Sequence, residues 1–118
     1  MLIVGHGSRL EGFDRPMKNL ARDLTREGLY SAVACAYLEI TSPTIEEALG
    51  ALIEKGAREI RILPYFLLTG RHVKEDLPRL VSAANRRLRG RVKILLCPYL
   101  GYDRGILSTA KRRLRARA

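Results

Sequence analysis

The two histidines of this 118-residue chain, His6 and His72, each follow an apolar run and lie close to glycine. An imidazole binds borderline divalent metals and accepts a proton near neutral pH. Glu39 ends a third apolar stretch and adds a carboxylate to the candidates. Two imidazoles and one carboxylate suit cobalt, nickel, iron or zinc, and three protein ligands leave positions open on the ion. These residue types predict a catalytic divalent-metal site.

The competing interpretation is that each histidine ends a strand and bonds a nearby backbone group. One histidine alone would favour that interpretation, but two in the same glycine-flanked setting favour function. Glu39 by itself fits a solvated carboxylate at a strand end equally well. The nearby Gly5, Gly7 and Gly70 permit close backbone approach to a ligand, or form simple turns.

Apolar runs and helical periodicities alternate four times along the chain. Strands are predicted at 2–5, 32–39, 59–67 and 92–96. A helix is predicted after each strand: one closed by Gly28, one capped by Ser42 with Pro43 in its first turn and ended by Gly56, one over 77–88 and one over 106–114. This alternation predicts a single α/β domain over 1–118, with a parallel sheet and helices on both faces.

The predicted sheet should bring the three candidate residues together. The run 59–67 is the most continuously apolar, which indicates a central strand. In a doubly wound sheet of this size the first and third strands are commonly neighbours, and ligands bind where the chain reverses direction between them. His6 and His72 would flank that crevice, with Glu39 at the same edge.

The charge balance favours an anionic partner, because the net charge is +10. Arg9, Arg71 and Lys74 flank the histidines and could pair with substrate carboxylates. Ser8 and the amides that follow it could bind an anion at the start of the first helix. The basic run 111–115 is predicted to be a solvated helix face, since no aromatic residue is interleaved with it for base stacking.

Several functional classes are disfavoured. No apolar stretch is long enough for a signal-peptide core or a membrane span, so we expect a cytoplasmic protein. The segment 5–7 lacks the third glycine of a dinucleotide fingerprint, and no Walker-type Gly-Lys-Ser/Thr occurs, so ATP use is not expected. Cys35 and Cys97 lie in apolar runs and are predicted to be small buried side chains rather than a disulfide.

Three segments carry a resemblance to a known family: 4–9, Leu38-Glu39 followed by 42–45, and 64–78. They resemble the short sirohydrochlorin cobaltochelatases, which are class II tetrapyrrole chelatases related to enzymes that insert iron or nickel. The resemblance spans nearly the whole chain. It implies a flavodoxin-like four-stranded sheet that inserts a divalent metal into sirohydrochlorin without ATP or a permanent cofactor, the metal being a substrate.

By the same resemblance, His6, His72 and Glu39 would bind the metal, and His6 would also take the pyrrole protons. The longer chelatases contain two such units, so the resemblance implies a homodimer. Sirohydrochlorin is a polycarboxylate, which suits a chain of net charge +10. Some relatives carry an acidic residue at the position of Ser42, and some carry a histidine-rich insertion that this chain lacks. The positions associated with the tetrapyrrole are Ser42, Leu67, Leu68, Thr69, Gly70 and Arg71.

Two alternatives remain open from the sequence. A histidine phosphotransfer enzyme also places a histidine after its first strand, but such enzymes resemble Arg-His-Gly there, and Gly5 stands at the arginine position. A nucleic-acid binder would use the basic last helix, and its salt-dependent binding would disappear on removal of 111–117.

Overall fold

A four-stranded parallel sheet forms the centre of the computed structural model, which describes residues 1–116. Its strand order is β2-β1-β3-β4, so the predicted contact between the first and third strands and the central position of β3 are confirmed. The strands are β1 (Leu2–Gly5), β2 (Ala34–Tyr37), β3 (Glu59–Pro64) and β4 (Lys93–Leu96). The second and third strands are shorter than predicted: β2 covers Ala34–Tyr37 instead of 32–39, and β3 ends at Pro64 instead of 67.

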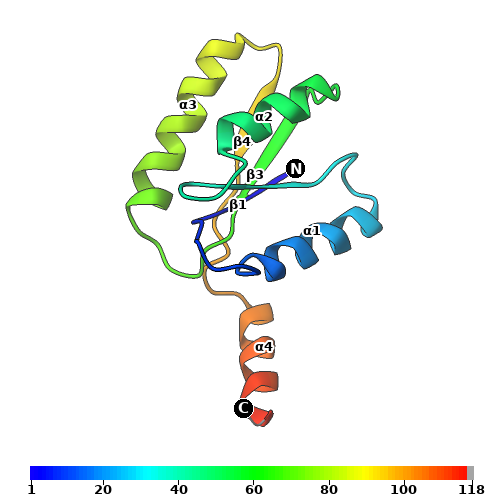
Figure 1. Ribbon diagram of the computed structural model, residues 1–118, viewed down its shortest axis with the longest axis vertical. Coiled ribbons are helices and arrows are strands. Elements are labelled where there is room, and N and C mark those ends of the chain that lie inside the picture. The colour runs from blue at the N-terminus through cyan, green and yellow to red at the C-terminus, as the bar shows by residue number, and fades with distance from the viewer. Residues whose placement is uncertain (117–118) are drawn as a thin grey trace.

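Helices cover the sheet unequally (Figure 1). One face of β1 and β2 carries α1, while α2 contacts β1 and β2 and α3 contacts β4 on the opposite face. A short π-helix, His72–Asp76, runs directly into α3. The helices are α1 (Arg15–Glu27), α2 (Ile45–Glu54), α3 (Leu77–Leu88) and α4 (Arg104–Arg115).

The alternation of side chains along the strands divides the core between the two faces. Leu2 and Val4 of β1 pack on the side of α2 and α3, together with Ile60 and Ile62 of β3. Ile3 points to the other side and packs with residues of α1. Side chains of this size stabilise the fold by about 1.5–3 kcal/mol each when fully buried. This rigid central pair of strands carries the loops described below.

The predicted cap of the second helix is wrong by two residues. Thr44, not Ser42, is the N-cap: its hydroxyl accepts a hydrogen bond from the Glu47 amide at 3.1 Å, and the Thr44 amide donates to the Glu47 carboxylate at 2.8 Å. This reciprocal pair requires an acidic or amide side chain three residues after the cap. Thr44 has Glu47 there, whereas Ser42 has Ile45.

The last helix forms where its periodicity predicts, but α4 does not cover the sheet. It extends away from the body of the molecule (Figure 1), and none of its residues is buried. The expected helices on both faces are therefore present only over β1 and β2, where α1 and α2 lie on opposite sides. No helix of the described residues is both long enough and apolar enough to cross a membrane.

Candidate metal-binding site

Backbone pairing continues past the ends of β1 and β2 and places His6 beside Glu39. The Leu38 amide donates to the Gly5 carbonyl and the Glu39 amide donates to the His6 carbonyl, both at 3.0 Å. These bonds continue the parallel pairing in register, with His6 opposite Leu38, so the Glu39 side chain leaves the neighbouring chain one residue beyond the level of His6. The prediction that strand pairing brings these residues to one edge is confirmed.

Two further contacts hold the same pair of loops together. The Thr41 hydroxyl accepts a hydrogen bond from the Ser8 amide at 3.0 Å and donates to the Ser8 carbonyl at 2.9 Å. Gly7 has φ +110°, and a Cβ there would overlap the Glu39 carbonyl oxygen. The loops therefore approach more closely at Gly7 than any residue with a side chain would allow.

His72 enters the site from the π-helix that precedes α3. The Leu77 amide bonds the His72 carbonyl across this wider turn. His72 Nδ1 lies 2.9 Å from Asp76 Oδ2. A carboxylate on Nδ1 favours the tautomer that carries the proton there, which leaves Nε2 as a free electron pair for a metal.

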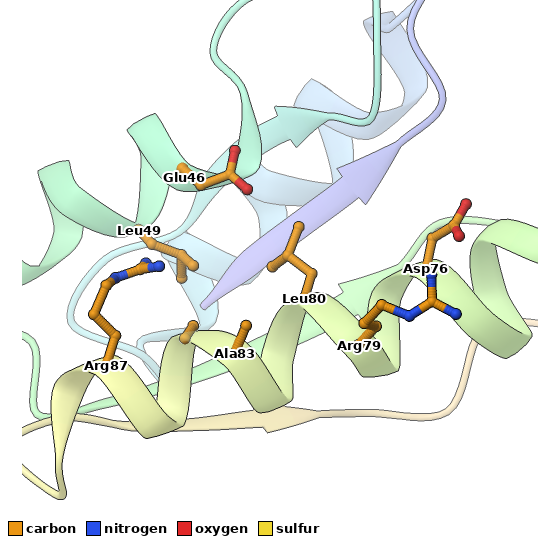
Figure 2. Close-up of a pocket in the computed structure, with 8 residues that line it drawn as sticks. Glu46, Leu49, Asp76, Arg79, Leu80, Ala83 and Arg87 are labelled. Carbon is orange, nitrogen blue, oxygen red and sulfur yellow. The ribbon is translucent and has the colours of Figure 1, made fainter.

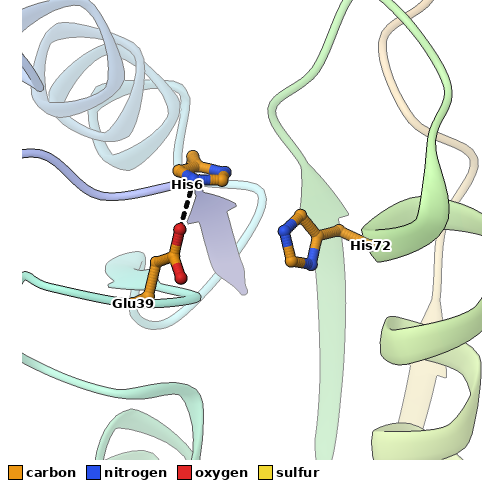
Figure 3. A group of neighbouring side chains, drawn as sticks. All are labelled: His6, Glu39 and His72. Carbon is orange, nitrogen blue, oxygen red and sulfur yellow. Dashed lines mark ion pairs between the residues drawn. The ribbon is translucent and has the colours of Figure 1, made fainter.

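The three predicted ligands converge (Figure 3). His6 Nε2 lies 2.6 Å from Glu39 Oε1, and the two imidazole rings are 5.2 Å apart, edge to face at 69°. One donor atom from each of His6, Glu39 and His72 lies within 4.8 Å of the others. The side chains remain 49%, 51% and 41% exposed, so the cluster stands at an open rim.

The donor set fits a divalent ion. Two donors that each bind an ion at about 2.1 Å are about 3.4 Å apart in tetrahedral coordination, so a pair as wide as 4.8 Å would have to close by about 1.4 Å. Rotation of exposed side chains supplies such a movement. Three ligands at an open rim would leave coordination positions free for exchange.

A family model described as CbiX matches residues 1–117. The chain belongs to the CbiX family. It is 29% identical over 113 residues to a sirohydrochlorin cobaltochelatase of Sulfolobus acidocaldarius, covering 96% of this chain and 87% of that protein. It is 37% identical over 82 residues to a protein of the same name from Methanocaldococcus jannaschii, covering 70% of this chain and 57% of the relative.

A solved structure supports the same assignment. The sirohydrochlorin chelatase SirB from Bacillus subtilis subspecies spizizenii, in complex with cobalt, superposes with a TM-score of 0.85 at 27% identity. The match covers 97% of this chain and 48% of SirB, so this CbiX chain spans about half of that protein. The predicted α/β chelatase fold is confirmed.

The residues predicted to touch the tetrapyrrole lie around the rim of this CbiX site, and most are exposed. Leu67 and Leu68 are 54% and 84% exposed and form an adjacent pair of apolar side chains on the loop before His72. Arg71 is paired with Glu75 at 3.6 Å. Exposed positions also include Arg9, Ser42, Thr69, Gly70 and Lys74.

The predicted anion site at the start of the first helix is wrong. The first helix begins at Arg15, well beyond Ser8. The Ser8 amide is used by Thr41, and the Ser8 hydroxyl accepts a bond from the Leu10 amide at 3.0 Å. Residues 9–14 form turns instead of extending the helix.

Two functional neighbours were missed from the sequence, Thr41 and Asp76. Asp76 stands four residues after His72, a spacing that places both side chains on one face of a helix, but the helix was predicted to begin only at residue 77. Thr41 has no comparable signal, because its partner Ser8 is 33 residues away in the sequence.

The cavities of this CbiX chain lie beside the cluster rather than around it. A groove of about 310 Å³ runs between α2 and α3 and reaches the site only through Asp76 (Figure 2). A smaller hollow of about 230 Å³ adjoins His6 and is lined by Phe13, Met17 and Tyr65. Both are at or below the lower end of ordinary small-molecule sites, so neither encloses a macrocycle. The groove is lined by Glu46, Leu49, Asp76, Arg79, Leu80, Ala83, Ala84 and Arg87.

Proposed function

We propose that this chain inserts a divalent metal, preferentially Co²⁺, into sirohydrochlorin without ATP. The observation that carries the proposal is the convergence of His6, Glu39 and His72 at an open sheet edge in a member of the CbiX family. Family membership favours a chelatase over a phosphotransfer enzyme or a nucleic-acid binder. The names of the two curated relatives and the cobalt in the SirB structure favour cobalt.

The three side chains divide the chemistry. Glu39 and the two imidazoles hold the incoming ion and replace part of its water shell, so that dehydration precedes transfer. Asp76 bonds His72 Nδ1 at 2.9 Å and aims the opposite nitrogen at the ion. His6, once released from the metal, would accept the two pyrrole protons in turn and pass each to solvent at the open rim, and adjacent Glu39 would stabilise the imidazolium that forms each time.

The rim would bind the macrocycle through two kinds of contact. Exposed Leu67 and Leu68 offer apolar surface to the ring. Arg9 and Arg71 would pair with peripheral carboxylates, for which Arg71 must leave its exposed and weak contact with Glu75. Ser42, Thr69 and Gly70 complete the proposed surface. The metal is a substrate of this reaction, and the proposal includes no permanent cofactor.

The working enzyme, we infer, is a dimer in which each chain is one chelatase unit. Each ligand is 41–51% exposed, so a single copy leaves the metal and a bound macrocycle open on one side. A second copy would close that side. Both cysteines are free thiols, which fits the reducing conditions of a cytoplasmic protein.

Visible absorption of anaerobic sirohydrochlorin tests the function. Purified protein with Co²⁺ and no ATP should convert the pigment to its metallated spectrum faster than the protein-free reaction, and parallel runs with Ni²⁺ and Fe²⁺ rank the metals. The His6→Ala/His72→Ala variant should lose this acceleration while its circular dichroism spectrum stays unchanged. Equal rates with and without wild-type protein for all three metals would refute the proposal.

A further inference from the structure

An exposed isoleucine occupies a strained backbone position beside one of the candidate metal ligands. Ile40 directly follows Glu39 and has φ +69°. Among the described residues, Arg89 at the end of α3 is the one other non-glycine residue with a positive φ. A β-branched side chain is strongly disfavoured in this left-handed region, where glycine and asparagine are the usual residues. Isoleucine is therefore poorly suited to the backbone conformation at position 40.

The hydrogen bonds around Ile40 explain its backbone conformation but not its side chain. The Thr41 amide donates to the Glu39 carbonyl at 2.7 Å, which closes a three-residue γ-turn with Ile40 at its centre. Beyond this turn, the Thr41 hydroxyl contacts both backbone groups of Ser8. None of these bonds uses the Ile40 side chain, so glycine or asparagine would form the same turn with less strain.

The Ile40 side chain contributes little to the core. It is 62% exposed and joins neither hydrophobic cluster of the described residues. Folding therefore gains little from burial of its apolar atoms, while its backbone conformation destabilises the folded state. Strained residues that are held in place by their surroundings cluster at functional sites. A contact with substrate would give the isoleucine side chain the role that the fold does not.

The surroundings of Ile40 indicate which ligand it would contact. The three metal donors lie within 4.8 Å of one another, and a tetrapyrrole ring is much wider than this cluster. Transfer of the ion requires the ring nitrogens to approach the donors, so the ring must extend over the residues beside them. Glu39 and His72 reach the cluster from different sides (Figure 3). Ile40 adjoins the first of these ligands, and exposed Leu67 and Leu68 precede the second.

We propose that Ile40 is a substrate-binding residue whose side chain packs on the face of the sirohydrochlorin ring. This role rests on the proposed function, which supplies the identity of the ligand. The γ-turn fixes the side chain beside Glu39 before the ring arrives, so little conformational freedom is lost on binding. Ile40 has no group that binds a metal or takes a proton, so it holds the ring and leaves metal and proton transfer to its neighbours.

The variant Ile40→Asn separates substrate binding from folding. Asparagine tolerates a positive φ, so the turn should persist and the Tm should rise by about 3–6 °C. Without the apolar contact, the KM for sirohydrochlorin should rise about tenfold while kcat stays unchanged. Co²⁺ affinity, measured by isothermal titration calorimetry, should equal that of wild type, whereas a role confined to placing Glu39 would weaken it. Ile40→Leu keeps an apolar side chain and should retain the wild-type KM.

Two matched controls locate the effect at the site. Arg89→Asn relieves the positive φ at the end of α3 and should raise the Tm while leaving the KM near the wild-type value. Leu29 is 73% exposed and precedes β2, whereas Ile40 follows that strand. Leu29→Asn should therefore remove an equally exposed aliphatic side chain without changing the KM. An unchanged KM in Ile40→Asn, or an equal rise in Leu29→Asn, would overturn the inference.

Binding of the metal-free pigment distinguishes this role from the proposed function. Absorption titration of anaerobic sirohydrochlorin with wild type and Ile40→Asn gives dissociation constants without turnover. A complex about tenfold weaker in Ile40→Asn supports the role of Ile40 even if no metal is inserted. Equal dissociation constants overturn it even if wild type is an active chelatase. Light scattering completes the test, because a loss of self-association with unchanged pigment binding would assign Ile40 to a contact between copies instead.

Discussion

The Thr41 side chain holds both backbone groups of Ser8, accepting from its amide at 3.0 Å and donating to its carbonyl at 2.9 Å. Ser8 lies two residues beyond His6, and Thr41 lies two residues beyond Glu39. One hydroxyl therefore locks together the two loops that supply adjacent candidate ligands.

Removal of that hydroxyl should loosen the metal site more than the fold. We expect Thr41→Val to weaken Co²⁺ binding by about tenfold, within the range seen for residues that support metal ligands. The loss of two hydrogen bonds should lower the free energy of unfolding by about 1–3 kcal/mol. Isothermal titration calorimetry checks the first value and urea unfolding the second. Thr41→Ser keeps the hydroxyl and should bind Co²⁺ as wild type does; equal losses in both variants would exclude this role.

Asp76 should affect Co²⁺ binding, by orienting His72, more than it affects folding stability. Asp76→Asn removes the carboxylate that lies 2.9 Å from His72 Nδ1, so the ring loses its preferred orientation and basicity. We expect Co²⁺ affinity to fall about 10–100-fold. Glu75→Gln is the neighbouring control, because the Glu75 carboxylate forms an exposed ion pair with Arg71 and not with His72. If both variants bind Co²⁺ equally well, the assignment of Asp76 is wrong.

A methyl group at Gly7 should destabilise the protein. Gly7→Ala would combine a positive φ of +110° with overlap on the Glu39 carbonyl oxygen. We expect a loss of about 1–3 kcal/mol in the free energy of unfolding. Gly70→Ala is the matched substitution, because a Cβ at Gly70 meets nothing within 4 Å. Thermal unfolding of the two variants checks the contrast, and comparable Tm values would contradict it.

Asp14 should make stability depend on acid pH. Its carboxylate accepts a hydrogen bond from the buried Tyr37 hydroxyl, and this bond, with help from nearby Lys18, lowers the pKa of Asp14. A lowered folded-state pKa stabilises the protein above the unfolded value of about 3.9, and this contribution disappears as pH falls through the folded value. Burial, and after it the same contact with Asp14, raises the pKa of Tyr37.

The Asp14 dependence can be isolated by substitution. Urea unfolding of Asp14→Asn should show a shallower fall in stability below about pH 4 than wild type, because one linked proton is removed. Asp23→Asn, at an exposed carboxylate, serves as the control for loss of charge on α1. A wild-type slope in Asp14→Asn would contradict the expectation.

Much of the central fold could be predicted because its determinants are local. The run 2–5 and the helical spacing before Gly28 and Gly56 identify buried faces, and regular alternation restricts how such elements connect. The meeting of His6, Glu39 and His72 follows, since parallel strands end at one edge. These features need only periodicity and topology.

The remaining features depend on contacts between distant residues or on surfaces the pattern does not identify. The bond between Thr41 and Ser8 joins loops that are far apart in sequence. The N-cap of α2 could have been Ser42 or Thr44, and the side chain three residues later decides between them. For α4, periodicity shows that the helix has an apolar side but not which surface covers it.

The hydrogen bond from the Glu39 amide to the His6 carbonyl has a consequence for how this site can change. Neighbouring strands stand about 4.8 Å apart in every sheet. The register that pairs Gly5 with Tyr37 places His6 opposite Leu38 one step on, so Glu39 lies one residue further along its chain, and the hydrogen bond from its amide fixes the spacing of the two backbones. Each position can therefore accept a different donor side chain while the spacing of the two backbones stays constant. Substitutions at single residues can then change which metal the site prefers.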